Sequence, residues 1–315
     1  MRNKAKTPQQ NIVAVAVDDH MAYAFFVLIS SLRNTAKIPF SLIIGYFEGR
    51  LSAANRRLMA QYMTQIGVDY EIRELQPHPL FTERRHLTIT TFSKFVISDA
   101  VAEPHVWIDI DTIAREGWDE IFALVHGAGD SAPLVVADKI ASPHTRFEGF
   151  NAGVLGWTSA PRKKWASALE RMPEKRFSSE QHLFNTLYES EAKRVDVSFN
   201  FLSSWHARAS ELARAVIIHY SGPIKPWHLP RRHSERWESI NPSWRAWFQA
   251  EDVLYTSLDG SPLSPGVRTQ AKKALQSGRL YAGKGAAAGL FMRTLVFLGP
   301  LGNPLVAALV ARGQR

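Results

Sequence analysis

The chain has 315 residues, 45% hydrophobic and 21% charged, which is typical of a soluble globular protein with one large or two small domains. It has no cysteine, which excludes disulfides, thiol nucleophiles, iron–sulfur clusters and cysteine-ligated zinc. Eight basic residues and no acid follow residue 260, and 30 basic and 29 acidic residues precede it. Eight of the nine net positive charges therefore lie in the tail, which argues against nucleic-acid binding by the body.

The first half of the sequence predicts strands that alternate with helices. The first ten residues are basic and polar and lead into no apolar signal-peptide region, so we expect a cytoplasmic protein. Ser52 is a plausible N-cap of the second helix, and Gly67 follows its last turn. Strands are expected at residues 12–17, 40–47, 69–75 and 105–111, and helices at residues 23–35, 53–66 and 91–100.

The second half continues this pattern and then changes character. Strands are expected at residues 134–138, 152–157 and 215–220, and helices at residues 162–171 and 179–188. The stretch "SPLSP", residues 261–265, is typical of a linker. We therefore expect an α/β domain over residues 1–260, with a mainly parallel sheet covered by helices on both faces, and a basic and apolar helical tail over residues 261–315.

Polar side chains follow four of the expected apolar strands. Asp18 and Asp19 follow the first, Asp109 and Asp111 end the fourth, and Asp138 and His219 end two later ones. Ligands of open α/β sheets bind outside the carboxyl ends of the strands, so these residues predict a site at that edge.

Asp109, Asp111 and His219 together are the ligand types that suit Mn²⁺ or Mg²⁺. If the strand continues, the two carboxylates share a face; if it ends there, a turn can bring both to one ion. Taken alone, an Asp-x-Asp is more often a solvated strand end, and a lone histidine on an apolar strand is usually structural. The stretch "HYSGPIKPWH" favours the metal, because Gly222 permits close backbone approach and Lys225 suits phosphate oxygens, as a diphosphate leaving group requires.

Several motifs resemble glycosyltransferase family 8, retaining enzymes of the glycosyltransferase-A fold, and most closely its bacterial lipopolysaccharide galactosyl- and glucosyltransferases. The resemblance covers residues 11–228 and includes "VAVDDHMAY", "HLTITTFSKF", "WIDIDT", "FNAGVLGW", "SEQHLFN", "SFNF" and "HYSGPIKPW". It implies that Asp109, Asp111 and His219 bind Mn²⁺ on the diphosphate of UDP-galactose or UDP-glucose, with Lys225 and Gly222 contacting that diphosphate.

The same resemblance implies roles for the remaining candidates. Asp18, with Asp19 beside it, would lie at the uracil. Asp138, Asn151 and Glu180 would hold the hydroxyls of the donor sugar, and Gln181 would lie near the anomeric carbon. The sequence departs from the family pattern in three places: Met21 stands where a tyrosine is usual, Phe92 and Lys94 replace a tyrosine and an arginine, and "EQH" at residues 180–182 replaces Asp-Gln-Asp.

Asp138 could instead cap the following segment, and Asn151 could be a turn residue. Glu180 and Gln181 also suit an exposed first helical turn.

No second carboxylate is evident at the anomeric position, so we expect same-face attack by the acceptor. The competing functions are a silent UDP-sugar-binding protein and a metal-dependent nucleotidyltransferase or phosphodiesterase. The basic tail, with an apolar stretch at residues 286–311, predicts peripheral attachment to the anionic cytosolic face of a membrane, where a lipid-linked glycan acceptor would lie. The alternative for the tail is a helical hairpin packed on the body.

Overall fold

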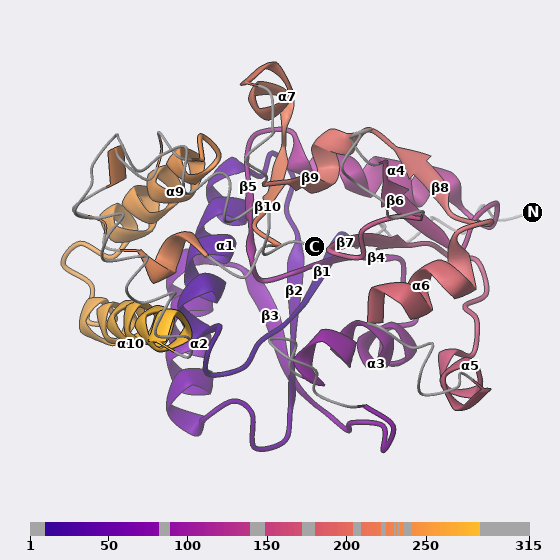
Figure 1. Ribbon diagram of the computed structural model, residues 1–315, viewed down its shortest axis with the longest axis horizontal. Coiled ribbons are helices and arrows are strands. Elements are labelled where there is room, and N and C mark those ends of the chain that lie inside the picture. Colours follow the sequence, from indigo (N-terminus) through magenta and orange to yellow (C-terminus); the bar gives the residue numbers. More distant parts are fainter. Residues whose placement is uncertain are drawn as a thin grey trace, which may run out of the picture.

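The protein is described by a computed structural model that covers residues 10–81, 89–138, 149–171, 180–203, 209–221, 225–229, 231, 234–235, 238 and 241–283. A seven-stranded sheet forms its centre, in the order β3-β2-β1-β4-β7-β6-β8 (Figure 1). β7 runs antiparallel to its neighbours β4 and β6, and the other neighbouring pairs are parallel, which confirms the expected mainly parallel sheet. The strands are β1 Ile12–Ala16, β2 Ser41–Phe47, β3 Asp69–Leu75, β4 His105–Ile108, β6 Leu134–Ala137, β7 Val154–Trp157 and β8 Lys193–Val195.

The inner strands are apolar throughout because both faces of the sheet are buried. In β1, Val13 and Val15 point into one hydrophobic core, and Ile12 and Ala14 point into the other. β4 divides in the same way, with Val106 in the first core and Trp107 in the second. Helices cover both faces, as the sequence predicted.

The first face carries α1 Ala22–Thr35, α2 Ala53–Ile66 and α4 Ile121–Ala128, and the second carries α3 Ser93–Ala100, α5 Trp165–Arg171 and α6 Glu180–Tyr188 (Figure 1). α2 has the expected ends: the Ser52 hydroxyl accepts a hydrogen bond from the Asn55 amide, and Gly67 takes the left-handed conformation, with φ of 65°. On the second face, the Phe95 and Phe184 rings stack at 3.9 Å, which joins α3 to α6.

A second, three-stranded sheet has the order β5-β10-β9. It consists of β5 Thr112–Ala114, β10 Ile217–His219 and β9 Phe201–Leu202. The expectation that His219 ends a strand of the central sheet is therefore wrong: β10 pairs with β5 and β9. The strands β5, β8 and β9, and the helices α4, α7 Ala209–Arg214 and α9 Trp244–Ser257, were not predicted.

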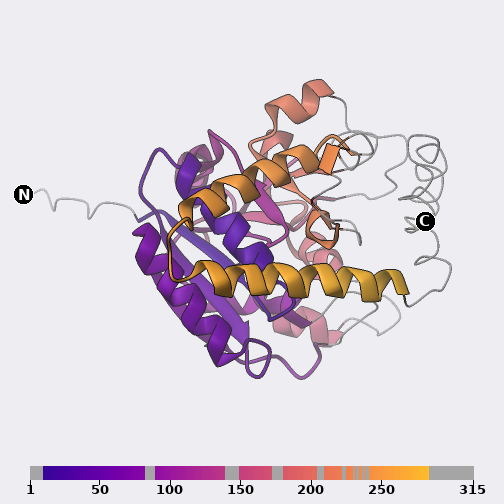
Figure 2. The ribbon, with the colours of Figure 1, turned by 90° about the vertical axis from the view of Figure 1, so that its left-hand side faces the viewer.

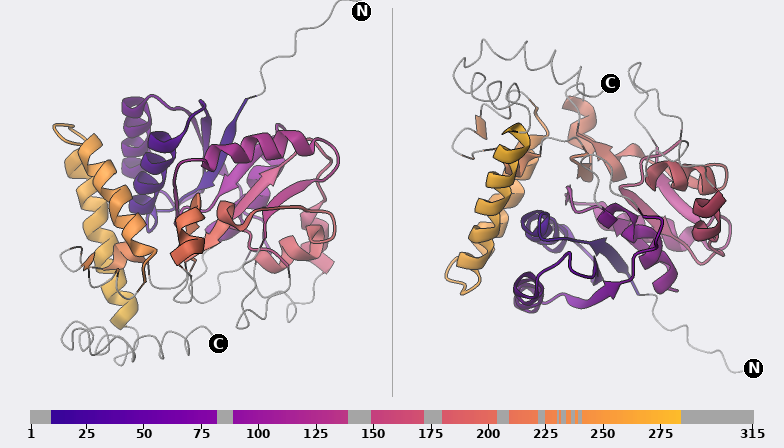
Figure 3. Two further views of the ribbon diagram at one scale, coloured as in Figure 1. Left: turned by 90° about the horizontal axis from the view of Figure 1, so that it is seen from above. Right: turned by 60° about the horizontal axis from the view of Figure 1, so that its bottom comes forward.

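The helices α9 and α10 Ser264–Gly283 lie on the outer side of α1, away from the central sheet (Figures 2 and 3). α10 begins within the stretch predicted as a linker, so that prediction is wrong for Ser264 and Pro265. Its buried side chains, Val267, Gln270 and Ala274, face the body. In the described part of the chain, no helix has an apolar stretch long enough to cross a bilayer. The predicted apolar segment, residues 286–311, lies outside the described residues.

Candidate active site

Asp109 and Asp111 lie in the short connection that carries the chain from the central sheet to the second sheet. β4 ends at Ile108 and β5 begins at Thr112, so the strand does not continue through the Asp-x-Asp and a turn presents both carboxylates. The Asp109 amide donates to the Gly153 carbonyl at 2.7 Å, and the Tyr220 amide donates to the Asp111 carbonyl at 2.8 Å. The turn is thus held by the residue before β7 and the residue after β10, and these strands belong to two different sheets.

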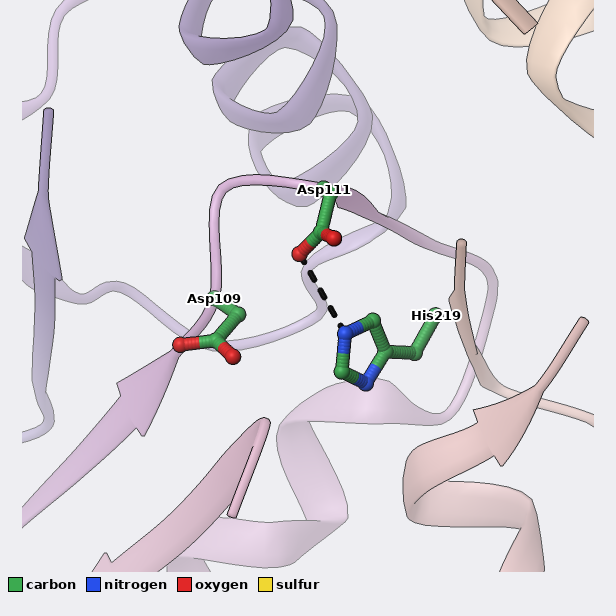
Figure 4. A group of neighbouring side chains, drawn as sticks. All are labelled: Asp109, Asp111 and His219. Carbon is green, nitrogen blue, oxygen red and sulfur yellow. Dashed lines mark ion pairs between the residues drawn. The ribbon is translucent and has the colours of Figure 1, made fainter. Parts of the chain in front are cut away.

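The side chains of Asp109, Asp111 and His219 converge on one point (Figure 4). One ligand atom from each lies within 4.8 Å of the other two, and Nε2 of His219 is 3.2 Å from Oδ1 of Asp111. Two carboxylates and an imidazole suit Mn²⁺ or Mg²⁺. Three protein groups also leave coordination positions for oxygens of a substrate. The residues present therefore fit a divalent cation, as the sequence predicted.

Lys225 places a positive charge directly beside this group. Its ammonium donates to Oδ2 of Asp111 at 2.6 Å and to the Tyr220 carbonyl at 2.5 Å. Burial alone would raise the pKa of Asp111, but Lys225 and His219 outweigh it and hold that pKa well below its ordinary value. Asp111 is therefore ionised at neutral pH, as a metal ligand must be. Gly222, the predicted partner of Lys225, lies outside the described residues.

Lys94 provides a second cation, which lies beside Asp109. It is 1% exposed, and its ammonium lies 3.1 Å from Oδ1 of Asp109, 3.1 Å from the Ala152 carbonyl and 3.7 Å from Oε1 of Glu180. Burial lowers the pKa of Lys94, but Asp109 and Glu180 outweigh it and raise that pKa above its ordinary value. Lys94 therefore stays charged inside the protein and joins the metal group to α6.

Glu180 and Gln181 form the first turn of α6 and face the site. Burial raises the pKa of Glu180, against the opposing effect of Lys94. Its second carboxylate oxygen, Oε2, is buried, and among the described residues nothing bonds to it. The Gln181 side-chain oxygen accepts a hydrogen bond from Nδ2 of Asn151 at 2.9 Å. The exposed helical turn that was the alternative for this pair is therefore not what the structure shows.

Asp18 and Asp19 follow β1, and their carboxylates accept hydrogen bonds from different parts of the chain. Asp18 is buried, and its carboxylate accepts the amides of His20 and Met21 and the Thr90 hydroxyl. The Asp19 carboxylate instead accepts the Ser52 amide and the Asn55 side chain at the start of α2. These contacts give Asp19 a structural role in holding α2 to β1.

Asp138 is the sequence candidate that lies apart. Its side chain is 57% exposed and reaches Arg194 at 3.5 Å. Within the described ranges, no hydrogen bond or ion pair connects it with Asp109, Asp111 or His219. The end of β6 thus delivers a carboxylate to the surface beside β8.

Three supporting residues were not singled out from the sequence. Trp107 donates its indole N–H to Oδ1 of Asp109 at 2.7 Å. Asn200 places Oδ1 3.0 Å from Nδ1 of His219. Gly153 packs against the imidazole of His219, where a β-carbon would lie 2.2 Å from Cε1. All three lie in motifs quoted above, but no spacing rule indicates that they support metal ligands.

Comparison with known proteins agrees with this geometry. Residues 12–229 match the family described as Glycosyl transferase family 8. A curated lipopolysaccharide 1,3-galactosyltransferase of Salmonella typhimurium is 25% identical over 247 residues, which cover 69% of this chain and 72% of that protein.

Solved structures resemble the chain in fold. The galactosyltransferase LgtC in complex with donor and acceptor sugar analogs superposes with a TM-score of 0.60 at 19% identity, covering 78% of this chain and 95% of that one. The apo-form glycosyltransferase GlyE of Streptococcus pneumoniae gives 0.57 at 18%, covering 80% and 64%. The family match spans every strand of the central sheet and all three candidate metal ligands, so the chain belongs to glycosyl transferase family 8 and is a glycosyltransferase, as the motifs predicted.

Proposed function

We propose that this glycosyltransferase moves a hexose, galactose or glucose, from a UDP-sugar to a saccharide acceptor with retention of configuration at the anomeric carbon. The observation that supports this most directly is the convergence of Asp109, Asp111 and His219 beside the Lys225 ammonium. A two-metal phosphodiesterase or nucleotidyltransferase would use further carboxylates at this point, where the chain presents a cation.

A divalent cation, Mn²⁺ with Mg²⁺ as the alternative, would be held by Asp109, Asp111 and His219 and would supply Lewis-acid stabilisation of the leaving diphosphate. The Lys225 ammonium would exchange its contact with Asp111 for a contact with a diphosphate oxygen. Gly222 would allow the backbone to approach the same diphosphate. Asp18, at the end of β1, would face the uracil, with Asp19 holding the adjacent turn to α2.

The donor sugar would lie between the metal group and α6. The buried Oε2 of Glu180 is available to accept a sugar hydroxyl, and Lys94 keeps that carboxylate in place. Asn151 and Asp138 are the further proposed sugar contacts, although Asn151 already bonds to Gln181 and Asp138 lies at the surface. Glu180 is one methylene longer than the aspartate usual in the family, which makes it the proposed determinant of the donor hexose.

Retention is best explained by attack on the face from which the diphosphate leaves. Gln181 is a weak nucleophile whose oxygen already accepts a hydrogen bond, and Glu180 is paired with Lys94. We therefore propose that the bond from the anomeric carbon to the diphosphate oxygen breaks as the acceptor oxygen bonds to the same face. The acceptor proton moves to the leaving diphosphate. A glycosylated Glu180 or Asp138 detected by mass spectrometry would contradict this route.

The acceptor is proposed to be lipopolysaccharide or another lipid-linked glycan. The curated relative is named as a lipopolysaccharide galactosyltransferase. On the described part of the tail, α10 exposes Arg268, Lys272 and Lys273, and the sequence has no acid between residues 261 and 315. Basic residues near an anionic leaflet each contribute about 1 kcal/mol of attraction. The cytosolic face of a membrane is therefore the proposed location. The division into a catalytic domain, residues 1–260, and a membrane-associating tail, residues 261–315, is part of the same proposal.

The deciding experiment is hydrolysis of a panel of UDP-sugars by the full chain with Mn²⁺ and without acceptor. We expect slow release of UDP from UDP-galactose or UDP-glucose, and its loss in Asp111→Asn, because a carboxylate ligand contributes a large share of the metal's several kcal/mol. Asp69→Asn, an exposed change on β3, is the matched control. Binding of UDP-sugar without any release would instead indicate a silent binder, and release of a nucleoside monophosphate would indicate a phosphodiesterase.

A further inference from the structure

We infer that Asn200 is a positioning residue that sets the tautomer of His219 and, through Asn151, connects the metal ligands to Gln181. This inference rests on the proposed function of the site, which it deepens. Asn200 lies at the end of the 3-10 helix η3 Val197–Asn200, where the chain enters β9, and β9 pairs with the strand that ends in His219.

The direction of the hydrogen bonds is fixed by a backbone group. The Gly153 amide can only donate, and it lies 2.9 Å from Oδ1 of Asn151, so that atom is an acceptor. The other end of the Asn151 amide, Nδ2, then donates to the side-chain oxygen of Gln181. The orientation of Asn151 is therefore determined without reference to the other side chains.

The orientation of Asn200 follows from that of Asn151. Its Nδ2 lies 2.9 Å from Oδ1 of Asn151 and 3.2 Å from the Asn151 carbonyl, and both of these atoms are acceptors. A reversed Asn200 amide would place an oxygen against two oxygens. Oδ1 of Asn200 must therefore be the atom that lies 3.0 Å from Nδ1 of His219.

A carbonyl oxygen cannot donate, so Nδ1 of His219 carries a proton, and Nε2 is the nitrogen left to offer a lone pair to a metal ion. Nε2 is the atom that faces Asp111, at 3.2 Å. This is the tautomer that a metal ligand at Nε2 requires, and a partner that orients a ligating histidine in this way contributes strongly to metal affinity. Both Asn200 and His219 are 3% exposed, so loss of the contact would leave a buried polar atom without this partner.

The same chain of amides determines how Gln181 is presented. Because its oxygen accepts from Asn151, the NH₂ end of the Gln181 amide is the end left for other partners. The order His219, Asn200, Asn151, Gln181 therefore joins the metal group to the residue proposed to lie near the anomeric carbon. Asn151 is in the centre of this chain, and its two side-chain atoms are both used within it.

The test is a direct measurement of the His219 tautomer by ¹⁵N NMR on the full-length, metal-free protein. The His219 signal is identified by its loss in His219→Gln. We expect Nδ1 to carry a proton in the wild type. We expect the same in Asn200→Asp, whose carboxylate still accepts from Nδ1. In Asn200→Ala we expect a shift toward the Nε2–H form, because the Asp111 carboxylate, 3.2 Å from Nε2, still accepts from that nitrogen. Asn241→Ala, which removes a buried amide bonded to Ser203 and Ser243, is the matched control and is expected to keep the wild-type tautomer.

A second readout is the affinity for Mn²⁺ alone, measured by calorimetry. We expect a loss of about 10- to 100-fold in Asn200→Ala and a much smaller loss in Asn200→Asp. Retention of the Nδ1–H form in a folded Asn200→Ala, an Nε2–H form in Asn200→Asp, or an equal shift in Asn241→Ala would each overturn the inference. If the tautomer shifts as expected but the wild type binds no Mn²⁺, the positioning role stands and the metal part of the proposed function fails.

Discussion

Gly153 and His219 lie so close together that a β-carbon on Gly153 would be 2.2 Å from Cε1 and 2.3 Å from Nδ1 of the imidazole. No side chain larger than hydrogen fits there while His219 keeps its position. We expect Gly153→Ala to displace the imidazole and weaken Mn²⁺ binding at least tenfold, because one of three protein ligands moves out of place. Calorimetric titration with Mn²⁺ measures this effect.

Gly127→Ala provides the control for this substitution. Gly127 lies within α4, and a β-carbon there meets nothing within 4 Å. The change should leave Mn²⁺ affinity unchanged and raise the free energy of unfolding by up to about 1 kcal/mol, as alanine favours a helix. Unchanged Mn²⁺ affinity in Gly153→Ala would show that His219 is not a ligand.

Lys225→Ala should lower kcat more than it raises KM for the donor. The Lys225 ammonium lies 2.6 Å from Asp111, where it can contact the leaving diphosphate, and the charge on that group grows in the transition state. Steady-state kinetics with saturating Mn²⁺ separate the two parameters. An effect on KM alone would restrict Lys225 to ground-state binding.

Lys94→Met should destabilise the protein because it leaves Asp109 and Glu180 without their buried counter-charge. Removing one partner of a buried ion pair costs about 3–5 kcal/mol, which urea denaturation detects. The double change Lys94→Met with Glu180→Gln should recover part of the loss, since one uncompensated carboxylate is removed. Lys37→Met, at an exposed position, is the control and should change stability by less than about 0.5 kcal/mol. Equal free energies of unfolding for Lys94→Met and Lys37→Met would contradict the buried pairing of Lys94.

His105 should make the folded protein sensitive to acid. Burial lowers the pKa of His105 from 6.5 to about 3, and protonation would place a charge on Nε2, which is buried and unbonded among the described residues. Between pH 6.5 and about pH 3, the unfolded chain binds a proton at His105 that the folded chain does not bind. The free energy of unfolding therefore falls as the pH falls, by about 1.4 kcal/mol per pH unit for one full proton. His105→Gln should reduce this slope between pH 4 and 6. Burial also lowers the pKa of His228, to about 4, but that residue is the same in both proteins. An identical slope would therefore mean that His105 titrates normally.

Deleting residues 284–315 tests the membrane proposal without removing α10, whose buried side chains pack on the body. The truncated chain should keep donor hydrolysis but bind anionic vesicles less tightly and transfer more slowly to a lipid-bound acceptor than to a soluble one. The pair of changes Lys272→Glu and Lys273→Glu should weaken vesicle binding in the full chain, with an effect that disappears at high salt. A full chain that ignores anionic vesicles at low salt would contradict the proposal.

The sequence alone predicted those strands and helices whose signals come from residues that are close together in the chain. The apolar strands around residues 12–17 and 40–47 and the capped helix after Ser52 were predicted because buried strands, N-caps and glycine C-caps depend on neighbouring residues. The short strands β8 and β9 carry no such signal. Their two or three residues become strands through hydrogen bonds to β6 and β10, which are distant in the sequence.

The sequence also supplied the residue types of the site, but tertiary structure decided which of them meet. Asp109, Asp111, His219 and Lys225 could be chosen because carboxylates, an imidazole and an ammonium at strand ends suit a metal and a diphosphate. Asp138 fitted the same rule, yet its side chain is exposed beside Arg194. The end of a strand fixes only where a residue lies along the sheet, whereas its side-chain partners depend on the packing of later segments.

The supporting residues show this limit most clearly. Asn200 is next to His219 only because β9 and β10 pair, and Gly153 is beside the same imidazole only because β7 approaches the second sheet. In the sequence, Asn200 and His219 are 19 positions apart. Hydrogen bonds and steric exclusion act over about 3 Å, so contacts between such distant residues are decided by the folded chain and not by any local pattern.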